Sequence, residues 1–345
     1  MIWYLNEGRE DDVVISTRIR LSRNLKGFLF PNKMDKTDSA ELLKKVKSAY
    51  DSDNELKKRF NFLNADEIPD MDKRLLVEKN QITHESVNSP LSCGLMLEKT
   101  ESTSVMINEE DHIRIQSMFC GLETEEAWEA CVSTDRLLAA HLPYLFDKDF
   151  GFLTAYPTVT GTGLIVSILL HLPGMVMTGN MENITAACEK LNVSLKSVYE
   201  YGKKLPGNMF ILSNKITTGE SEESIINVIR DVAKQISDQE RVLRQILVKQ
   251  NANKMEDRVF RALGTFLNAR IISYEECLVL MNDIRFGVFT GMIGNFGFKT
   301  LNELLVIIKP AHVQQFKGRP MMPQEKDITR AEMIRHKMDK FFTKG

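Results

Sequence analysis

"VVISTRIRLSR", residues 13–23, is the stretch of sequence that decides the fold. Apolar and polar residues alternate along it, which is typical of a β-strand with two different faces. One face carries Val13, Ile15, Thr17, Ile19 and Leu21; the other carries Ser16, Arg18, Arg20 and Ser22. Two arginines spaced in this way suit an oligophosphate, because each guanidinium can bond two oxygens. A solvated outer face explains the alternation equally well, so the pattern alone leaves both interpretations open.

A second polar row occurs in "INEEDHIRIQ", residues 107–116. Read as one strand, it places on a single side Asn108, Glu110, His112, Arg114 and Gln116. A carboxylate, an imidazole and a guanidinium in one row are costly to bury without a function. The polar face of an edge strand is the alternative. His112 by itself is predicted to be a hydrogen-bonded structural histidine rather than a catalyst.

Bulk composition excludes several classes of protein. The 345 residues are 43% hydrophobic and 27% charged, as in a soluble globular protein with a real core. A net charge of −2 gives no overall attraction to nucleic acid or membrane. No apolar run reaches the roughly 18 residues of a membrane span, and no signal peptide is expected. We therefore expect a cytoplasmic protein with neither a nucleic-acid nor a membrane partner.

The cysteines are dispersed along the chain at positions Cys93, Cys120, Cys131, Cys188 and Cys277. None forms a C-x-x-C pair, so neither zinc nor another protein-bound metal is expected. An odd, scattered set is typical of reduced thiols in the cytoplasm, most of them small core residues.

Periodicity predicts helices before and after a central sheet. Helices are expected at 37–60, 122–147, about 220–250, 255–284 with a break near Ser273, and 323–342; strands at 87–117, 151–155, 174–178 and 209–214. This α+β order favours an antiparallel or mixed sheet. Thr217 with Glu220 is predicted to form a capping box.

Two motifs, "VVISTRIRLSRN" and "NEEDHIRIQ", resemble the phosphagen (guanidino) kinases. The bacterial branch, the protein arginine kinases of the McsB type, is resembled by "GFLTAYPTVTGTGLIVSILLHLPG", "NMFILSNKIT", "EDRVFRALGTFLNARII" and "KDITRAEMIR". The resemblance covers nearly the whole chain in order. It implies an N-terminal segment and small helical domain at 1–85, whose residues 12–24 join the catalytic site. It also implies a catalytic domain at 86–345, with an antiparallel sheet flanked by helices and a helical tail.

The resemblance also implies the chemistry and its residues. Mg-ATP would be the donor, with Mg²⁺ held by the nucleotide phosphates, and protein arginine side chains the acceptors. Glu110 matches the catalytic glutamate, which orients the guanidinium and takes up its proton. The nucleotide-binding positions correspond to Ser16, Arg18, Arg20, Arg114 and Lys196. Asp327 and Arg330 match a phosphoarginine-binding motif, in which Lys326 replaces an arginine.

Several family positions are replaced in this chain. Tyr156 stands for a cysteine, Val159 for an asparagine, Ile165 and Lys196 for arginines, Tyr201 for an acidic residue and Asn80 for a histidine. Removing one preorganised donor costs about 10²–10³ in rate, and losses within one site are not additive. The combined replacements predict transfer slowed by roughly 10³ or more. The alternative is a pseudokinase that acts as a nucleotide- or partner-binding regulator.

The remaining expectations concern partners. The resemblance implies ATP or ADP and arginine-containing protein substrates, in protein quality control. It adds a zinc-binding activator protein, a Clp-type unfoldase and a homodimer as candidates. A kinase for free arginine or creatine is a weaker third option, because the tail motif indicates protein substrates.

Overall fold

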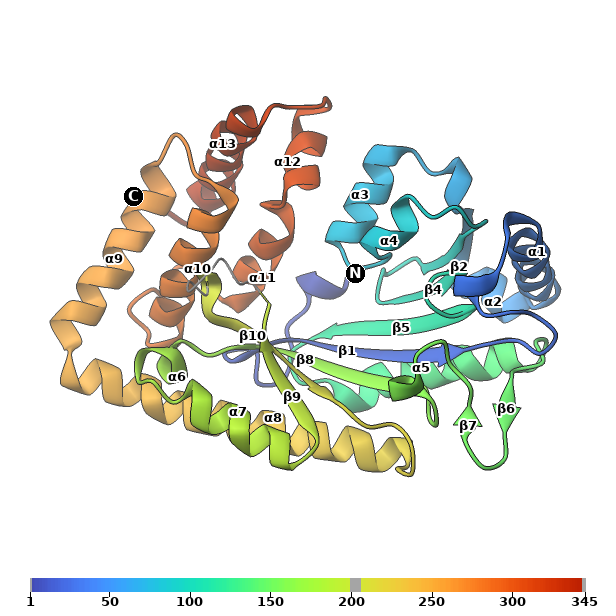
Figure 1. The fold of residues 1–345 in the computed structure, drawn as a ribbon. Helices are drawn as coiled ribbons and strands as arrows, with labels where there is room; N and C mark the ends of the chain where they lie inside the picture. The colour runs from blue at the N-terminus through green and yellow to red at the C-terminus, as the bar shows by residue number, and fades with distance from the viewer. Residues whose placement is uncertain (1, 199–205, 343–345) are drawn as a thin grey trace. The chain divides into compact units, whose positions relative to one another are not determined.

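The structure, a computed structural model, describes residues 2–198 and 206–342 (Figure 1). Its strands are β1 (Val14–Arg23), β2 (Phe60–Asn64), β3 (Gly94–Glu98), β4 (Thr103–Ile107), β5 (Ile113–Cys120), β6 (Phe146–Asp147), β7 (Gly151–Phe152), β8 (Leu164–His171), β9 (Val193–Ser197) and β10 (Met209–Asn214). Its α-helices are α1 (Lys36–Ser52), α2 (Asn54–Arg59), α3 (Asp70–Glu78), α4 (His84–Val87), α5 (Thr124–Ala139), α6 (Pro173–Met177), α7 (Met181–Lys190), α8 (Glu222–Gln250), α9 (Ala252–Asn268), α10 (Tyr274–Phe289), α11 (Phe298–Ile307), α12 (Pro310–Lys317) and α13 (Pro323–Phe342).

The central feature is a large β-sheet. Within the described ranges, eight strands follow the order β2-β3-β4-β5-β1-β8-β10-β9, and β6 pairs with β7 in a separate hairpin. The run from β2 through β3 and β4 to β5 is antiparallel, and so is the pairing of β5 with β1. The predicted α+β fold, with an antiparallel sheet flanked by helices, is therefore confirmed.

The register between β1 and β5 determines which polar side chains share a face. Arg18 lies opposite Met118, Arg20 opposite Gln116 and Ser22 opposite Arg114. The alternate residues of β1, including Ile19 and Leu21, are fully buried. The two-faced strand predicted from residues 13–23 is therefore confirmed.

The chain divides into two compact units whose segments interleave along the sequence. The first unit contains residues up to Trp3, Ser16–Ile168 and Ser213–Asp231; the second contains Tyr4–Ile15, Leu169–Leu212 and the residues from Val232 onward. This grouping follows contacts rather than continuous segments, and the division into 1–85 and 86–345 stays a prediction.

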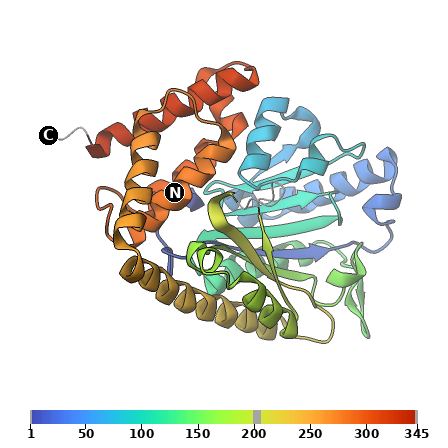
Figure 2. The same ribbon diagram turned by 60° about the vertical axis from the view of Figure 1, so that its left-hand side comes forward.

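The second unit has a helical core. Phe266 of α9, Leu278 of α10, Leu301 of α11 and Ile334 of α13 are all fully buried in one apolar cluster. Figure 2 shows α9, α10 and α13 side by side, in orange to red. Ser273 ends the connection between α9 and α10, because its hydroxyl accepts a hydrogen bond from Glu276 N and caps α10. The predicted break near Ser273 is confirmed.

Several predicted elements differ in the structure. The helix expected at 122–147 ends at Ala139, with β6 at Phe146–Asp147, and the strand expected at 151–155 is limited to Gly151–Phe152. The helix expected at 37–60 is interrupted at Asp53, whose carboxylate accepts hydrogen bonds from Glu55 N and Leu56 N and starts α2. The strand expected at 174–178 is wrong, because residues 173–177 form helix α6. Its first amides, Gly174 N and Met175 N, donate to the Glu240 carboxylate at 2.7 and 2.9 Å.

All five cysteines are buried, as small core residues are expected to be. Over the described residues, no helix combines the length and the apolar composition that crossing a bilayer requires.

Candidate active site

The "INEEDHIRIQ" segment is a hairpin rather than the single strand predicted from its alternation. Asn108 adopts a left-handed conformation with φ of 58°, and its N–H donates to His112 O at 3.0 Å. Asp111 stabilises the turn, because its Oδ1 accepts from Asn24 Nδ2 at 2.6 Å and from Ala155 N at 2.8 Å. Glu109 and Glu110 therefore lie at the turn between β4 and β5, and Arg114 lies on β5.

Arg18, Arg20 and Arg114 form one cluster of positive charge. Burial and the positive charge of Arg114 lower the pKa of Arg18 to about 10. Burial and the charges of Arg18 and Arg114 hold the pKa of Arg20 well below its ordinary value. The strand register agrees: Arg20 lies opposite Gln116, and Arg114 lies two residues away on β5, on the same face and opposite Ser22. The structure therefore brings together three of the predicted nucleotide-binding residues.

Two carboxylates from the hairpin turn face this cluster. Arg114 Nη1 donates a hydrogen bond to Glu109 Oε2 at 2.5 Å and forms an ion pair with Glu110 Oε2 at 3.2 Å. Glu109 is almost fully buried, and its other oxygen accepts from the Thr83 hydroxyl at 2.6 Å. The Glu110 side chain is 46% exposed, so one of the two carboxylates stays accessible to a ligand. Glu109 was not predicted as a site residue, although its place beside Glu110 in "NEEDH" was the available signal.

An unsatisfied donor marks the centre of the cluster. Arg20 Nε is buried and has no hydrogen-bond partner in the described part of the chain. A buried polar group of this kind calls for a ligand or water, because an unmade hydrogen bond is costly. The described cluster has three guanidinium groups against two carboxylates, so an anion such as a phosphate fits both its charge and its open donor.

His112 is a structural histidine, as predicted. Its Nδ1 accepts from Leu25 N at 2.9 Å, and its Nε2 lies 2.6 Å from Leu29 O. Burial lowers the pKa of His112, so the neutral ring with its proton on Nε2 satisfies both contacts.

The other predicted site residues lie in different places. Ser16 is buried on β1 opposite Cys120, and Lys196 is exposed on β9 in the second unit. Arg330 on α13 is 2% exposed; it donates to Ile308 O and Ile272 O and pairs with Asp327 at 2.5 Å. Its guanidinium thus holds helices of the second unit together in this structure. Tyr201 lies outside the described residues.

The glycine-threonine turn at 160–163 is held by side chains from elsewhere in the first unit. The Thr217 hydroxyl donates to Thr158 O and Thr160 O, and Arg23 Nη1 donates to Thr162 O at 2.9 Å. The predicted capping box at Thr217 is therefore wrong: α8 begins at Glu222, and Ser221 Oγ accepts from Ser224 N instead. Arg23, which sequence reasoning did not select, supplies the cation that the turn itself lacks.

The replaced positions around this turn are described in part. Tyr156 is 54% exposed at the start of the turn, and Ile165 is half-buried on β8. Ile165 has no polar atom and cannot donate to a phosphate as an arginine would, and Tyr156 offers a neutral phenol in place of a thiol.

Comparison with solved structures assigns the class of fold. A lombricine kinase superposes with a TM-score of 0.61 at 20% identity, over 69% of this chain and 68% of that chain. The duplicated taurocyamine kinase from Schistosoma mansoni gives 0.62 at 22% identity, over 76% of this chain and 40% of that chain. The fold is that of the guanidino kinases.

Sequence comparison then assigns the family. The ATP:guanido phosphotransferase C-terminal catalytic domain matches residues 41–243, and the C-terminal domain of the protein-arginine kinase McsB matches residues 252–344. Protein-arginine kinases from Halothermothrix orenii and Geobacillus thermodenitrificans are 36% and 39% identical, over 98% and 97% of this chain and 96% and 93% of theirs. The chain belongs to the ATP:guanido phosphotransferase family, in its protein-arginine kinase branch. The resemblance stated from the motifs is confirmed.

Proposed function

We propose that this protein transfers the γ-phosphoryl group of ATP to arginine side chains of proteins, at a rate well below that of an intact site. One observation carries the proposal: Arg18, Arg20 and Arg114 converge beside the accessible carboxylate of Glu110, with Arg20 Nε left without a partner in the described chain. The relatives named protein-arginine kinase support the choice of acceptor.

The proposed chemistry uses these groups in two roles. The arginine cluster neutralises the phosphate oxygens as charge develops, and positioning supplies most of the catalysis. Glu110 accepts two N–H bonds from the substrate guanidinium and takes its proton as a bond forms between that nitrogen and the γ-phosphorus. The bond from the γ-phosphorus to the bridging oxygen breaks, and ADP leaves. Mg²⁺, carried by the nucleotide phosphates, supplies further positive charge.

The contacts of Arg114 indicate how its guanidinium is positioned before the substrate binds. In this structure Arg114 Nη1 donates a hydrogen bond to Glu109 and forms an ion pair with Glu110. Because Glu109 is anchored by Thr83 and is nearly buried, it holds Arg114 in place. The longer contact to Glu110, at 3.2 Å, can exchange for a substrate guanidinium without disturbing that anchor.

The slowed rate is proposed from the replacements. Ile165 stands for a phosphate-binding arginine, Tyr201 for a guanidinium-binding carboxylate and Lys196 for a bidentate arginine. The same replacements motivate the second candidate function, a pseudokinase that binds nucleotide or partners without efficient transfer. Predicted binding at Ser16, Lys196, Asp327 and Arg330 remains part of the proposal.

A transfer assay and a binding assay together test both candidates. Incubation of the protein at high concentration with radiolabelled Mg-ATP and casein should give acid-labile label, and the Glu110→Gln variant should give none. Absence of label in the unaltered protein would refute the kinase. Calorimetry with Mg-ADP should show binding that Arg20→Met abolishes; binding without label would identify the pseudokinase. Label formation as fast as in ordinary kinases would refute the pseudokinase.

The cellular setting is proposed from the family alone. We propose a cytoplasmic protein of protein quality control, with a zinc-binding activator protein, a Clp-type unfoldase and a second copy of the chain as candidate partners. Co-purification from the native host with a tagged chain tests all three.

A further inference from the structure

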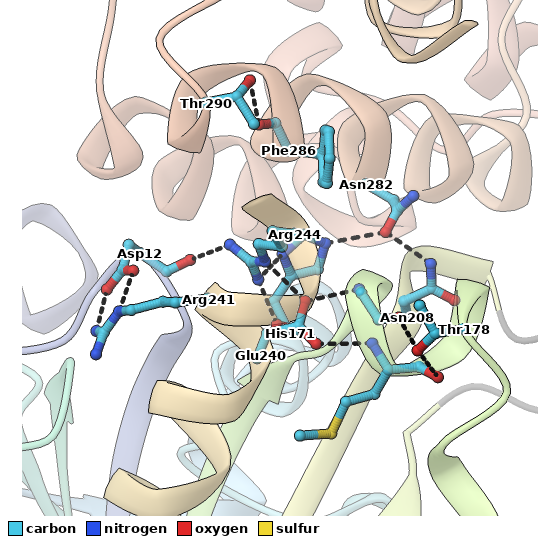
Figure 3. Close-up of polar contacts among 12 residues, drawn as sticks. Asp12, His171, Thr178, Asn208, Glu240, Arg241, Arg244, Asn282, Phe286 and Thr290 are labelled. Carbon is cyan, nitrogen blue, oxygen red and sulfur yellow. Dashed lines mark hydrogen bonds and ion pairs between the residues drawn. The ribbon is translucent and has the colours of Figure 1, made fainter. Parts of the chain in front are cut away.

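Three consecutive acidic residues, Glu10, Asp11 and Asp12, precede β1 and are held by arginines within the second unit. Arg241 on α8 donates two hydrogen bonds to the Asp12 carboxylate, from Nε to Oδ2 at 2.7 Å and from Nη2 to Oδ1 at 2.6 Å (Figure 3). The same Nη2 reaches Glu10 Oε2 at 2.5 Å. We call residues 10–12 the acidic turn.

Two further arginines hold the backbone of the acidic turn. Arg244 Nη1 donates to Asp12 O at 3.1 Å, and Arg285 Nη2 donates to Asp11 O at 2.5 Å. Arg244 is itself immobilised, because it pairs with Glu240 at 2.7 Å and donates to His171 O at 2.6 Å, with no exposed side-chain surface (Figure 3). Arg244 thus binds the turn from a fixed position.

The acidic turn leads directly into the strand that carries the phosphate-site arginines. Glu10 has a left-handed φ of 60°, and its carbonyl accepts from Val13 N at 3.0 Å and Val14 N at 2.7 Å. Strand β1 starts at Val14, and Arg18 and Arg20 follow on the same strand. Any shift of the turn therefore acts on the strand at its first residue.

We propose that Arg241 is a positioning residue: by holding the acidic turn it sets the placement of β1 and hence of Arg18 and Arg20. The inference rests on the proposed function, in which these two arginines bind nucleotide phosphates. Arg241 contacts neither nucleotide nor substrate in this role. Small displacements matter here, because a 1 Å misplacement caused by a distant mutation can lower the reaction rate about 10²-fold.

Helix α8 offers a matched control. Arg230 lies on the same helix and pairs with the carboxylates of Glu125 and Asp231, whereas Arg241 pairs with Asp238 as well as with Glu10 and Asp12 of the acidic turn. Its side chain is 34% exposed, against 26% for Arg241. Arg241→Gln and Arg230→Gln each remove partly exposed ion pairs of α8, and of the two only Arg241→Gln releases the acidic turn.

Calorimetric titration with Mg-ADP, at a temperature where circular dichroism shows every variant folded, tests the proposal. Arg241→Gln should weaken Mg-ADP binding about tenfold. This is smaller than the roughly 10²-fold loss of reaction rate that a 1 Å misplacement can cause. Arg230→Gln should change it less than about twofold, as expected for an exposed pair. Arg241→Lys, which keeps the charge but loses the fork, should fall between. Unchanged affinity in Arg241→Gln, even with a lowered melting temperature, would reduce the turn to a structural contact and overturn the proposal.

Hydrogen exchange separates this inference from the proposed function. If the unaltered protein fails to bind Mg-ADP, the proposed nucleotide site is wrong. Exchange of the backbone amides of residues 14–20 then shows whether the contact of Arg241 with the acidic turn acts on β1. Faster exchange there in Arg241→Gln than in Arg230→Gln supports the positioning role. Equal exchange in the two variants overturns it.

Discussion

Asp135 on α5 accepts two hydrogen bonds from Arg23 on β1 through a single carboxylate oxygen, at 3.2 Å from Nε and 2.9 Å from Nη2. The same guanidinium lies 3.7 Å from the centre of the Phe152 ring and donates to Thr162 O. The glycine-threonine turn has no cation of its own. It is therefore held by the Arg23 guanidinium, which Asp135 of α5 keeps in place.

This pair predicts a large stability cost when one partner is removed. Both side chains are nearly buried, so Asp135→Ala leaves the Arg23 charge without its carboxylate. Breaking a buried pair in this way costs about 3–5 kcal/mol. The free energy of unfolding in urea measures it. Arg136→Ala, an exposed neighbour on α5, should stay within about 0.5 kcal/mol. A loss below about 1 kcal/mol for Asp135→Ala would contradict the assigned role.

Replacing Gly163 is predicted to lower the free energy of unfolding through a steric clash. It has φ of +68°, and an added Cβ would lie 2.6 Å from Ser22 O and 2.7 Å from Arg23 Nη1. Gly27 is the matched control, with φ of +86° and nothing within 4 Å. Both alanine variants carry the left-handed strain of about 1–2 kcal/mol. Gly163→Ala should lose about 1–3 kcal/mol more, because the clash is added. Equal melting curves for the two variants would mean that the backbone around Gly163 moves aside at no cost, which contradicts the prediction.

Local patterns predicted the fold well, and distant contacts account for what they missed. The alternation in residues 13–23 is a local property of a strand, and the structure keeps it. The hairpin at 107–116 was missed because Asp111 is satisfied by Asn24 and Ala155, which are remote in sequence. The run at 174–178 was assigned as a strand because a short apolar run does not distinguish strand from helix. Glu240, 66 residues away, decides for helix α6 by binding its first amide.

The candidate site followed the same division. Arg18, Arg20 and Arg114 were found from two motifs, and the β1–β5 register places them together. Arg23 and Glu109 were missed, since their roles depend on Asp135, Thr162 and Thr83, which no spacing in the sequence connects.

The environment of Glu110 predicts a pH dependence. Burial, with the negative charges of Glu109 and Asp111, raises the pKa of Glu110 above its ordinary value against the opposing charges of Arg114 and Arg20. Since the ionised carboxylate is the proposed proton acceptor, transfer should decline on the acid side at a higher pH than an ordinary glutamate would give. Carbon-13 NMR titration of the carboxyl measures the pKa directly, even if transfer is absent. Glu325 provides an internal contrast, because its hydrogen bond from Arg319 lowers its pKa. A Glu110 midpoint at or below that of Glu325 would contradict the prediction.

Restoring the replaced side chains predicts a gain of activity. Ile165→Arg returns a phosphate-binding cation on β8, and Lys196→Arg with Tyr201→Glu returns the fork and the second carboxylate. A single preorganised donor is worth about 10²–10³ in rate, and the gains are not expected to add. Acid-labile label on casein under single-turnover conditions measures the series. Ile165→Leu controls for a change of shape without charge and should give no gain. If the triple variant also gives no gain while Mg-ADP still binds, the replacements are not the cause of slow transfer. The nucleotide-binding residues are then intact, and the residues that bind the substrate guanidinium have been altered elsewhere.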